Sequence, residues 1–263
     1  MEFKDICDKE QSEGKMDRSS GIEEVFSRLA LLVGEDGFRR LRDASVFVCG
    51  TGGVGSWAVE ALVRCGVGHL TMMDADTVKP SNINRQLCAL HSTLGRNKVE
   101  VLAERMRDIS PEAAITPLAK HLAPDECRPF LEEHHFDCVI DAIDERPTKL
   151  ALLEACFCMK LPVISSMGAA NKIDPSQVRV ADISETCGCP LARLMRKSLH
   201  KCGIESGIRV VFSPELPLRE TSGNTPEATG EKRPIGTIAF MPAIFGLFCA
   251  SEAIRLLLDK SEY

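Results

Sequence analysis

The sequence predicts an α/β fold: a doubly wound, mostly parallel, Rossmann-like sheet with helices on both faces. Apolar runs of strand length alternate with helical patterns of roughly ten to fifteen residues, which is typical of parallel sheets with helical crossovers. A glycine-rich turn at 50–55 separates the first strand from the next helix. With 263 residues and 44% hydrophobic content, the chain can bury one large core. We therefore expect a single domain over residues 21–263.

The elements of the first two thirds follow this alternation. Residues 1–20 are polar and charged without an apolar period, so we expect them to be disordered. Helical spacing over 22–44, broken at Gly34, predicts two short helices before the first strand. The following strands are expected at 45–50, 69–74, 114–119, 136–144 and 161–168, and the helices between them at 53–65, 95–109, 125–134 and 146–160.

The last third departs from the alternation. Residues 184–207 are basic and have helical spacing, so we expect a basic helical segment there. Residues 213–234 are rich in Pro, Gly, Ser, Thr and Glu, which predicts a mobile loop. Residues 235–259 are expected to form a short strand followed by a helix.

The apolar run at 235–251 has two interpretations. It carries no charge, which is typical of a membrane span. Pro242 near its start, and Glu252 and Arg255 just after it, instead favour a short strand and a buried helix. We therefore expect no membrane insertion.

Composition limits the classes of function. The formal net charge of -6 argues against nonspecific nucleic-acid binding by the whole surface, although a local basic patch could still bind RNA. The chain opens with no apolar signal sequence, so its 12 cysteines are expected to be reduced thiols in the cytoplasm. No Cys-x-x-Cys pair occurs, which argues against a structural zinc site with four cysteines.

The glycine turn predicts a nucleotide site. Gly50, Gly52 and Gly55 match the GxGxxG pattern, directly follow a strand and open a helix. This arrangement lets backbone amides and the helix N-terminus approach a phosphate group. Asp74 ends the second strand, where a carboxylate can accept hydrogen bonds from ribose hydroxyls. An adenine nucleotide is the expected ligand, and both NAD and ATP are open at this point.

The loop after the second strand favours ATP. It carries Asn82, Asn84, Arg85 and Gln86, and Lys98 opens the next helix. A dehydrogenase has no special need for cations at this edge. Nucleotidyl transfer does need them, because negative charge grows on the departing pyrophosphate.

Two carboxylates end another parallel strand, in "VIDAIDERPTK". Asp141 and Asp144 are thereby expected at the ligand edge of the sheet. An aspartate at such a position is commonly a helix cap. Beside ATP, we interpret Asp144 as a ligand of Mg²⁺.

Taken together, these motifs resemble the ubiquitin-activating superfamily in its bacterial ThiF and MoeB branch. The matching pieces, in family order, are "GTGGVGS", the aspartate of "MMDAD", "NINRQ", the lysine of "GRNKVE" and "VIDAID". The resemblance implies an enzyme that adenylates a carboxylate with ATP and Mg²⁺. It implies phosphate binding by Gly50, Gly52, Gly53 and Gly55, ribose binding by Asp74, triphosphate binding by Asn82, Arg85 and Lys98, and metal binding by Asp144.

The resemblance also implies a homodimer. Arg28 in "FSRLALLVGEDG" matches a family arginine that reaches into the active site of the neighbouring subunit. Arg28 would then join Arg85 and Lys98 as a catalytic residue in a composite site. Without the resemblance, Arg28 is equally well interpreted as a surface charge on a helix.

A longer resemblance concerns the tRNA threonylcarbamoyladenosine dehydratase branch of this family. It extends over "PLARLMRKSLHKCGI", "RVVFSPELP" and "KRPIGTIAFMPAIFGLFCASEAIRLL", and so covers nearly the whole chain after Gly21. The branch is described as cyclising the threonylcarbamoyl group of an adenosine beside the tRNA anticodon, with loss of water. The implied steps are adenylation of the threonyl carboxylate by ATP, followed by intramolecular attack and release of AMP.

Other functions stay open. One alternative is an adenylyltransferase that activates the C-terminal carboxylate of a ubiquitin-like sulfur-carrier protein, although many of these enzymes carry the Cys-x-x-Cys pairs that this chain lacks. This alternative would imply a sulfur-transfer partner. Weaker alternatives are an NAD-dependent oxidoreductase and an inactive nucleotide-binding scaffold.

A local basic cluster is consistent with an RNA substrate. Residues 191–209 hold five basic side chains against Glu205 alone. The same pattern also suits an ordinary solvated helix face. The residues that we assign to tRNA are Arg193, Arg196, Lys197 and Lys201.

The Cys-Gly-Cys in "ETCGCPLAR" departs from the pattern expected of the branch. Cys187 and Cys189 are open to a redox or metal role, or to no role beyond plain substitution. Cyclisation itself needs no thioester, because the attacking group is already tethered to the carboxylate.

Overall fold

The computed structural model describes residues 24–218 and 235–258, and within them the predicted fold class is confirmed. A seven-stranded sheet has the order β3-β2-β1-β4-β5-β7-β6, and every neighbouring pair is parallel except β6 with β7. The predicted disordered segment 1–20 and most of the predicted loop 213–234 lie outside the described residues. The strands are β1 Ser45–Cys49, β2 His69–Met73, β3 Ala114–Leu118, β4 Cys138–Asp141, β5 Val163–Ser166, β6 Arg179–Asp182 and β7 Arg209–Phe212.

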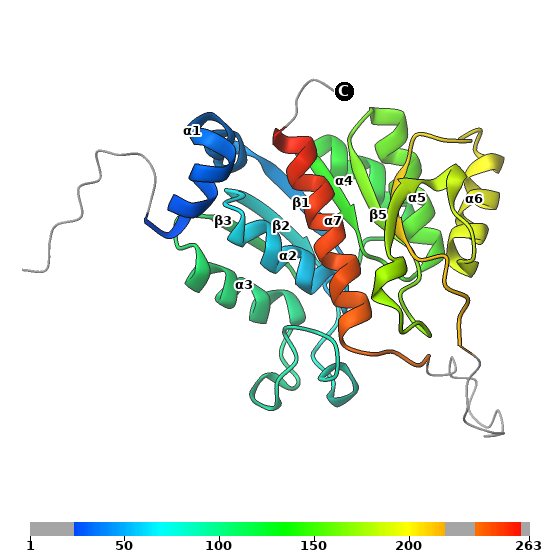
Figure 1. The fold of residues 1–263 in the computed structure, drawn as a ribbon, viewed down its shortest axis with the longest axis horizontal. Helices are drawn as coiled ribbons and strands as arrows, with labels where there is room; N and C mark the ends of the chain where they lie inside the picture. Colours follow the sequence, from blue (N-terminus) through cyan, green and yellow to red (C-terminus); the bar gives the residue numbers. More distant parts are fainter. Residues whose placement is uncertain (1–23, 219–234, 259–263) are drawn as a thin grey trace, which may run out of the picture.

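Helices cover both faces of the sheet, as predicted (Figure 1). Along β1, Val46 and Val48 face one helical layer, whereas Phe47 and Cys49 face the other. The first layer holds α1, α2, α3 and α7, and the second holds α4, α5 and α6. The helices are α1 Ser27–Asp43, α2 Gly55–Arg64, α3 Lys98–Ile109, α4 Cys127–Glu133, α5 Arg146–Met159, α6 Pro190–Lys201 and α7 Phe240–Leu258.

The predicted helix break at Gly34 is confirmed. Gly34 has φ 74° and ψ 167°, so it interrupts the helical geometry within α1. The two halves are the two short helices expected before β1. Only the second half carries residues buried against the core, namely Gly37, Phe38 and Leu41.

The C-terminal third differs from the predicted structure in three places. Strand β7 was not anticipated, although it lies between β5 and β6 inside the sheet. The basic segment 184–207 contains a helix only at Pro190–Lys201, because Pro190 begins it and Gly203 at φ 78° follows its end. The predicted strand before α7 is wrong: β7 already has a neighbour on each side, and residues 235–239 lie outside the sheet.

Residues 235–239, hereafter the crossing segment, lead into α7 at the carboxyl edge of the sheet. The carbonyl of Gly236 accepts a hydrogen bond from the Asn171 amide at 2.9 Å, in the loop after β5. The carbonyl of Thr237 accepts one from the Asn84 side chain at 3.3 Å, in the loop after β2. The crossing segment therefore connects two loops that follow different strands.

Helix α7 is long and apolar enough to cross a membrane by length and composition alone. However, 61% of its apolar window is buried inside the fold, which is also typical of the core helix of a soluble protein. Figure 1 shows α7 in red across the sheet, next to α2. Buried Glu252 on α7 forms ion pairs with Arg209 and Arg255, each at 2.9 Å. These contacts agree with the buried helix that the sequence predicted.

A buried ion pair connects β4 to α5 in the middle of the sheet. Lys149 Nζ lies 2.7 Å from Asp141 Oδ2, and both side chains are 0% exposed. Asp141 also accepts hydrogen bonds from Ser165 Oγ at 2.6 Å and from the Ile143 amide at 3.1 Å. Asp141 therefore serves the fold, and it is not the exposed carboxylate that a metal ion would need.

We expect Lys149→Met to lower the free energy of unfolding by about 3 to 5 kcal/mol, because it leaves the Asp141 carboxylate buried without a countercharge. Chemical denaturation monitored by circular dichroism would measure this loss. Adding Asp141→Asn should recover part of it, since an uncharged amide costs less to bury. Arg39→Ala, which removes an exposed ion pair with Asp36, is the matched control and should leave stability unchanged.

Candidate active site

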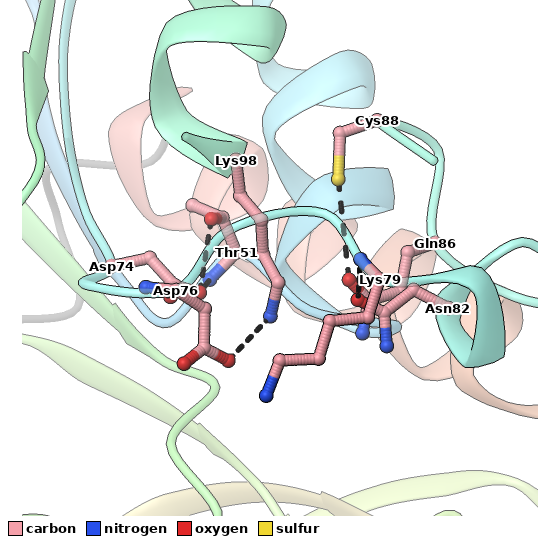
Figure 2. Close-up of polar contacts among 8 residues, drawn as sticks. All are labelled: Thr51, Asp74, Asp76, Lys79, Asn82, Gln86, Cys88 and Lys98. Carbon is pink, nitrogen blue, oxygen red and sulfur yellow. Dashed lines mark hydrogen bonds and ion pairs between the residues drawn. The ribbon is translucent and has the colours of Figure 1, made fainter. Parts of the chain in front are cut away.

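The residues predicted to bind the nucleotide gather at the carboxyl edge of the sheet, beyond β1, β2 and β4. This edge is where open parallel sheets bind their ligands. Figure 2 shows Thr51 from the glycine turn beside Asp74, and Asp76 and Lys98 next to them. The remaining labelled residues follow along the loop after β2.

Two glycines of the turn are required by packing. Gly50 has φ 88°, and a Cβ there would lie 2.7 Å from the Ala142 carbonyl oxygen of the loop after β4. A Cβ on Gly55 would lie 1.8 Å from the Gly50 carbonyl oxygen, closer than any side chain can come. These two positions bring the turn, the start of α2 and the end of β4 into close contact.

Gly52 has a different environment. Its backbone is outside the left-handed region, and a Cβ there would lie 3.7 Å from Gln86 Nε2, an ordinary contact distance. Neither conformation nor packing therefore requires a glycine at this position. A glycine that the fold does not need, in a turn aimed at the ligand edge, is best explained by close approach of a phosphate group.

Asp74 is oriented by the turn that precedes α2. Its Oδ2 accepts hydrogen bonds from the Thr51 amide at 2.7 Å and from Thr51 Oγ1 at 3.0 Å. Its Oδ1 accepts one from the Asp76 amide at 2.9 Å. The carboxylate is half-buried and keeps acceptor capacity for the hydroxyls of a ribose.

Lys98 reaches the same edge from the first residue of α3. Its side chain is only 5% exposed, and its Nζ forms an ion pair at 2.7 Å with Asp76, which is 63% exposed. Asp76 was missed in the sequence because only the first aspartate of "MMDAD", Asp74, was assigned a function. Lys79, also missed, extends from the following loop toward this pair (Figure 2).

Arg85 lies beside the glycine turn. Its Nη1 donates hydrogen bonds to the Ser81 carbonyl at 2.8 Å and to Asn84 Oδ1 at 3.0 Å. Its own carbonyl accepts a hydrogen bond from Trp57 Nε1 at 3.3 Å. A Cβ on Gly53 would lie 3.4 Å from Arg85 Cγ, so the stem of this arginine passes directly over the turn.

Asn82 and Gln86 are more buried than a ligand contact would suggest. The Asn82 carboxamide oxygen accepts a hydrogen bond from the Lys79 amide at 3.0 Å and closes the short 3-10 helix Pro80–Asn82. Gln86 lies next to Gly52 in the same loop. Asn82 thus has a structural function, whatever it does toward a nucleotide.

Asp144 and Asp141 differ in environment, although the sequence placed both at this edge. Asp144 is exposed in the loop after β4, whereas Asp141 is fully buried in its ion pair. Among the described residues, no group of three or more His, Cys, Asp or Glu side chains could hold a metal ion. A single carboxylate is still compatible with Mg²⁺, which binds nucleotides through one or two carboxylates, phosphates and water.

Arg28 lies at the opposite edge of the sheet. Its neighbours Phe26 and Leu29 contact Gly66, which follows α2 just before β2 begins. Figure 1 shows α1 in blue at the far end of the sheet from the loop at 75–97. Arg28 therefore cannot reach the glycine turn of its own chain.

The thiols near the site are poor nucleophiles. Burial raises the pKa of the Cys88 thiol to about 11, so it is protonated at neutral pH. Burial also holds the pKa of Cys49, below the turn, well above its ordinary value. Of the cysteines left open by the sequence, Cys187 is exposed and Cys189 is buried where α6 begins.

The basic residues assigned to tRNA do not all lie alike on α6. Arg193, Lys197 and Lys201 are exposed and recur every fourth residue, so they form one stripe along the helix. Arg196 instead donates a hydrogen bond to the Thr186 carbonyl at 2.7 Å. The stripe begins near the carboxyl edge of the sheet. Cys189 comes just before α6, and its Sγ lies 3.6 Å from where a Cβ on Gly168 would be. Gly168 follows the carboxyl end of β5.

The contrast between Gly52 and Gly55 gives a paired prediction. Gly52→Ala should fold with an unchanged melting temperature and weaken ATP binding, because its methyl group enters only the space for the phosphate. Gly55→Ala should lower the melting temperature, because its methyl group meets the Gly50 carbonyl. Thermal unfolding with and without ATP measures both effects, and full ATP stabilisation of Gly52→Ala would contradict the phosphate interpretation.

Comparison with known proteins agrees with this geometry. The chain is 39% identical over 244 residues to the tRNA threonylcarbamoyladenosine dehydratase of Bacillus subtilis, covering 90% of this chain and 96% of the relative. It is 38% identical over 255 residues to the Haemophilus influenzae protein of that name, covering 93% and 97%. A crystal structure of the Escherichia coli enzyme in complex with ATP matches with a TM-score of 0.80 at 35% identity, over 90% of this chain and 94% of that one. The model of the ThiF family matches residues 26–263, and the chain therefore belongs to the ThiF family.

Proposed function

We propose that the protein is an ATP-dependent dehydratase that cyclises threonylcarbamoyladenosine next to the anticodon of tRNA. The observation that carries the proposal is the glycine turn, where Gly52 is free for a phosphate, the stem of Arg85 packs against Gly53, and Lys98 pairs with Asp76 just after Asp74. Relatives that cover nearly the whole chain bear this name, and one of them has been solved with ATP. The resemblance stated from the motifs points the same way.

The chemistry assigned to the site is adenylation of the threonyl carboxylate. The carboxylate attacks the α-phosphate of ATP, pyrophosphate leaves, and the carboxylate becomes a mixed anhydride with AMP. Arg85 and Lys98 stabilise the negative charge that grows on the pyrophosphate. The tethered carbamoyl group then attacks the activated carbonyl and releases AMP, so that water is lost overall.

Mg²⁺ is the metal that the exposed Asp144 carboxylate suits. It would neutralise the phosphates of ATP beside the turn, with Asp144 as the protein ligand. The Asn82 side chain and Asp74 complete the nucleotide contacts that we assign. A cytoplasmic location, as expected from the sequence, would suit an enzyme that uses ATP and tRNA.

The α6 stripe is our candidate surface for the tRNA backbone. Arg193, nearest the carboxyl edge, would contact phosphates close to the reacting adenosine, and Lys197 and Lys201 would contact phosphates farther away. None of these three side chains has an ion-pair partner among the described residues. Arg196 is left out of this surface because it holds Thr186.

A homodimer would bring Arg28 to an active site. Exposed apolar side chains accompany Arg28 on α1, with Leu31 88% and Leu32 82% exposed, and α1 packs against α7, where Leu247 and Phe248 are also exposed. Exposed apolar side chains of this size are typical of an interface in a symmetric dimer. A monomeric mass by light scattering in solution would contradict this part of the proposal.

The alternative is an adenylyltransferase for a ubiquitin-like sulfur carrier. It would use the same turn, Arg85 and Lys98, and it differs only in which carboxylate is activated. The missing Cys-x-x-Cys pairs favour the tRNA substrate. An NAD-dependent oxidoreductase is disfavoured because it would leave both cations without a function.

Incubation with tRNA that carries threonylcarbamoyladenosine tests the proposal directly. With ATP and Mg²⁺, the nucleoside should lose the mass of one water and AMP should appear in equal amount. Omitting ATP, or chelating Mg²⁺, should leave the nucleoside unchanged. Nucleoside mass spectrometry measures the product, and an intact nucleoside after complete incubation, with AMP formed only when a Gly-Gly-tailed protein is supplied, would favour the alternative.

The α6 stripe predicts how the affinity for tRNA depends on salt concentration. Replacing Arg193 or Lys197 by Ala should weaken tRNA binding, and each change should reduce the slope of log affinity against log salt by about 1, because one phosphate contact is lost. Filter binding at several salt concentrations would measure the slope. Arg40→Ala, an exposed site on α1, is the control, and equal slopes for all variants would exclude α6 from the tRNA interface.

A further inference from the structure

Asn84 makes two side-chain contacts that lead to different parts of the molecule. Its Oδ1 accepts a hydrogen bond from Arg85 Nη1 at 3.0 Å. Its Nδ2 donates one to the carbonyl of Thr237 in the crossing segment, at 3.3 Å. Because a carboxamide has one acceptor end and one donor end, these partners fix its orientation: turning it over would break both bonds.

The contact with Arg85 bears on where that guanidinium lies. Apart from Asn84, the hydrogen-bond partner of this guanidinium among the described residues is the Ser81 carbonyl. The backbone of Arg85 is held separately, by Trp57 Nε1. Asn84 is therefore the one side chain of the described residues that restrains the charged end of Arg85, whose stem lies against the turn at Gly53.

The contact with Thr237 connects Asn84 to the part of the carboxyl edge that lies beyond β5 and β7. The crossing segment is attached to the loop after β5, since the Asn171 amide donates to the Gly236 carbonyl at 2.9 Å. That loop is itself anchored by Lys172, whose buried Nζ donates to the carbonyls of Ser213 and Glu215. The crossing segment thus takes its position from the β5 and β7 side of the carboxyl edge.

We propose that Asn84 is a positioning residue that couples the crossing segment to the Arg85 guanidinium. The proposal rests on the function assigned above to Arg85. A displacement of the crossing segment moves Thr237, releases the Asn84 carboxamide and so frees the guanidinium from the position in which Asn84 and the Ser81 carbonyl hold it. Substrate that docks against the β5 and β7 side is thereby linked to the cation that stabilises the departing pyrophosphate.

Two substitutions test the two hydrogen bonds that the Asn84 carboxamide makes. Asn84→Ala removes both contacts. Asn84→Asp keeps an oxygen for Arg85 but places a carboxylate oxygen against the Thr237 carbonyl, so it breaks the link to the crossing segment and also adds a negative charge beside Arg85. Asn84 is exposed, and we expect both variants to fold with an unchanged melting temperature.

The measurement is single-turnover formation of AMP with modified tRNA, alongside the dissociation constant of ATP. Asn84→Ala should slow AMP formation roughly 10- to 100-fold, as expected for loss of a hydrogen bond to a charged group, with little change in ATP affinity. Asn84→Asp should also be slowed. A rate like that of the unmodified protein in either variant would overturn the coupling.

A double-mutant cycle with Arg85→Ala supplies a readout that a merely structural role would not move. If Asn84 acts through Arg85, Asn84→Ala should cause no further loss in the Arg85→Ala background. Independent, multiplicative losses would overturn the proposal. An Arg85→Ala variant that turns over normally would refute the function of Arg85 itself, whereas a slow Arg85→Ala with a normal Asn84→Ala refutes only the coupling. Ser92→Ala, exposed in the same loop, is the control.

Discussion

The carboxyl edge of the sheet depends on the buried ion pair between Asp141 and Lys149. Asp141 is the last residue of β4, and its partners come from α5, β5 and the loop that follows. Lys149 Nζ also donates to the Ile143 carbonyl at 3.1 Å, so the same pair fixes the loop between them. That loop presents the Ala142 carbonyl to Gly50 and carries Asp144. The turn and the candidate metal ligand therefore share one anchor.

A buried pair of this kind is costly to desolvate, and its benefit is geometric. Ala142 lies so close to Gly50 that even a methyl group at Gly50 would not fit. A small displacement of the loop after β4 would consequently displace the glycine turn. The ion pair and the close glycine contacts together give the phosphate site a fixed shape, which is what electrostatic stabilisation of a transition state requires.

The two candidate catalytic cations are held in different ways. Lys98 is almost fully buried and is paired with an exposed carboxylate on Asp76, so its direction is set by α3 and by one ion pair. Arg85 is held by a backbone carbonyl and by a neutral carboxamide, and within residues 24–218 and 235–258 no ion pair compensates its charge. An uncompensated guanidinium is the better group to respond to a change in phosphate charge, and this difference is why we place the coupling at Arg85.

The sequence by itself determined the fold class, most strand and helix positions of the first two thirds, and the residues that could meet at one edge of the sheet. It could do so because these depend on local signals: apolar periodicity, the glycine turn after a strand, and the rule that parallel strands end together.

Only the tertiary structure decided which residues of the same type, close together in the sequence, have different functions. Burial separated Asp141 from Asp144, and packing made Gly50 and Gly55 structural while leaving Gly52 free. Long-range contacts also placed β7 inside the sheet and excluded residues 235–239 from it. A further contact of this kind is the hydrogen bond from Arg196 to the Thr186 carbonyl. Such contacts join residues far apart in the chain, and no local pattern encodes them.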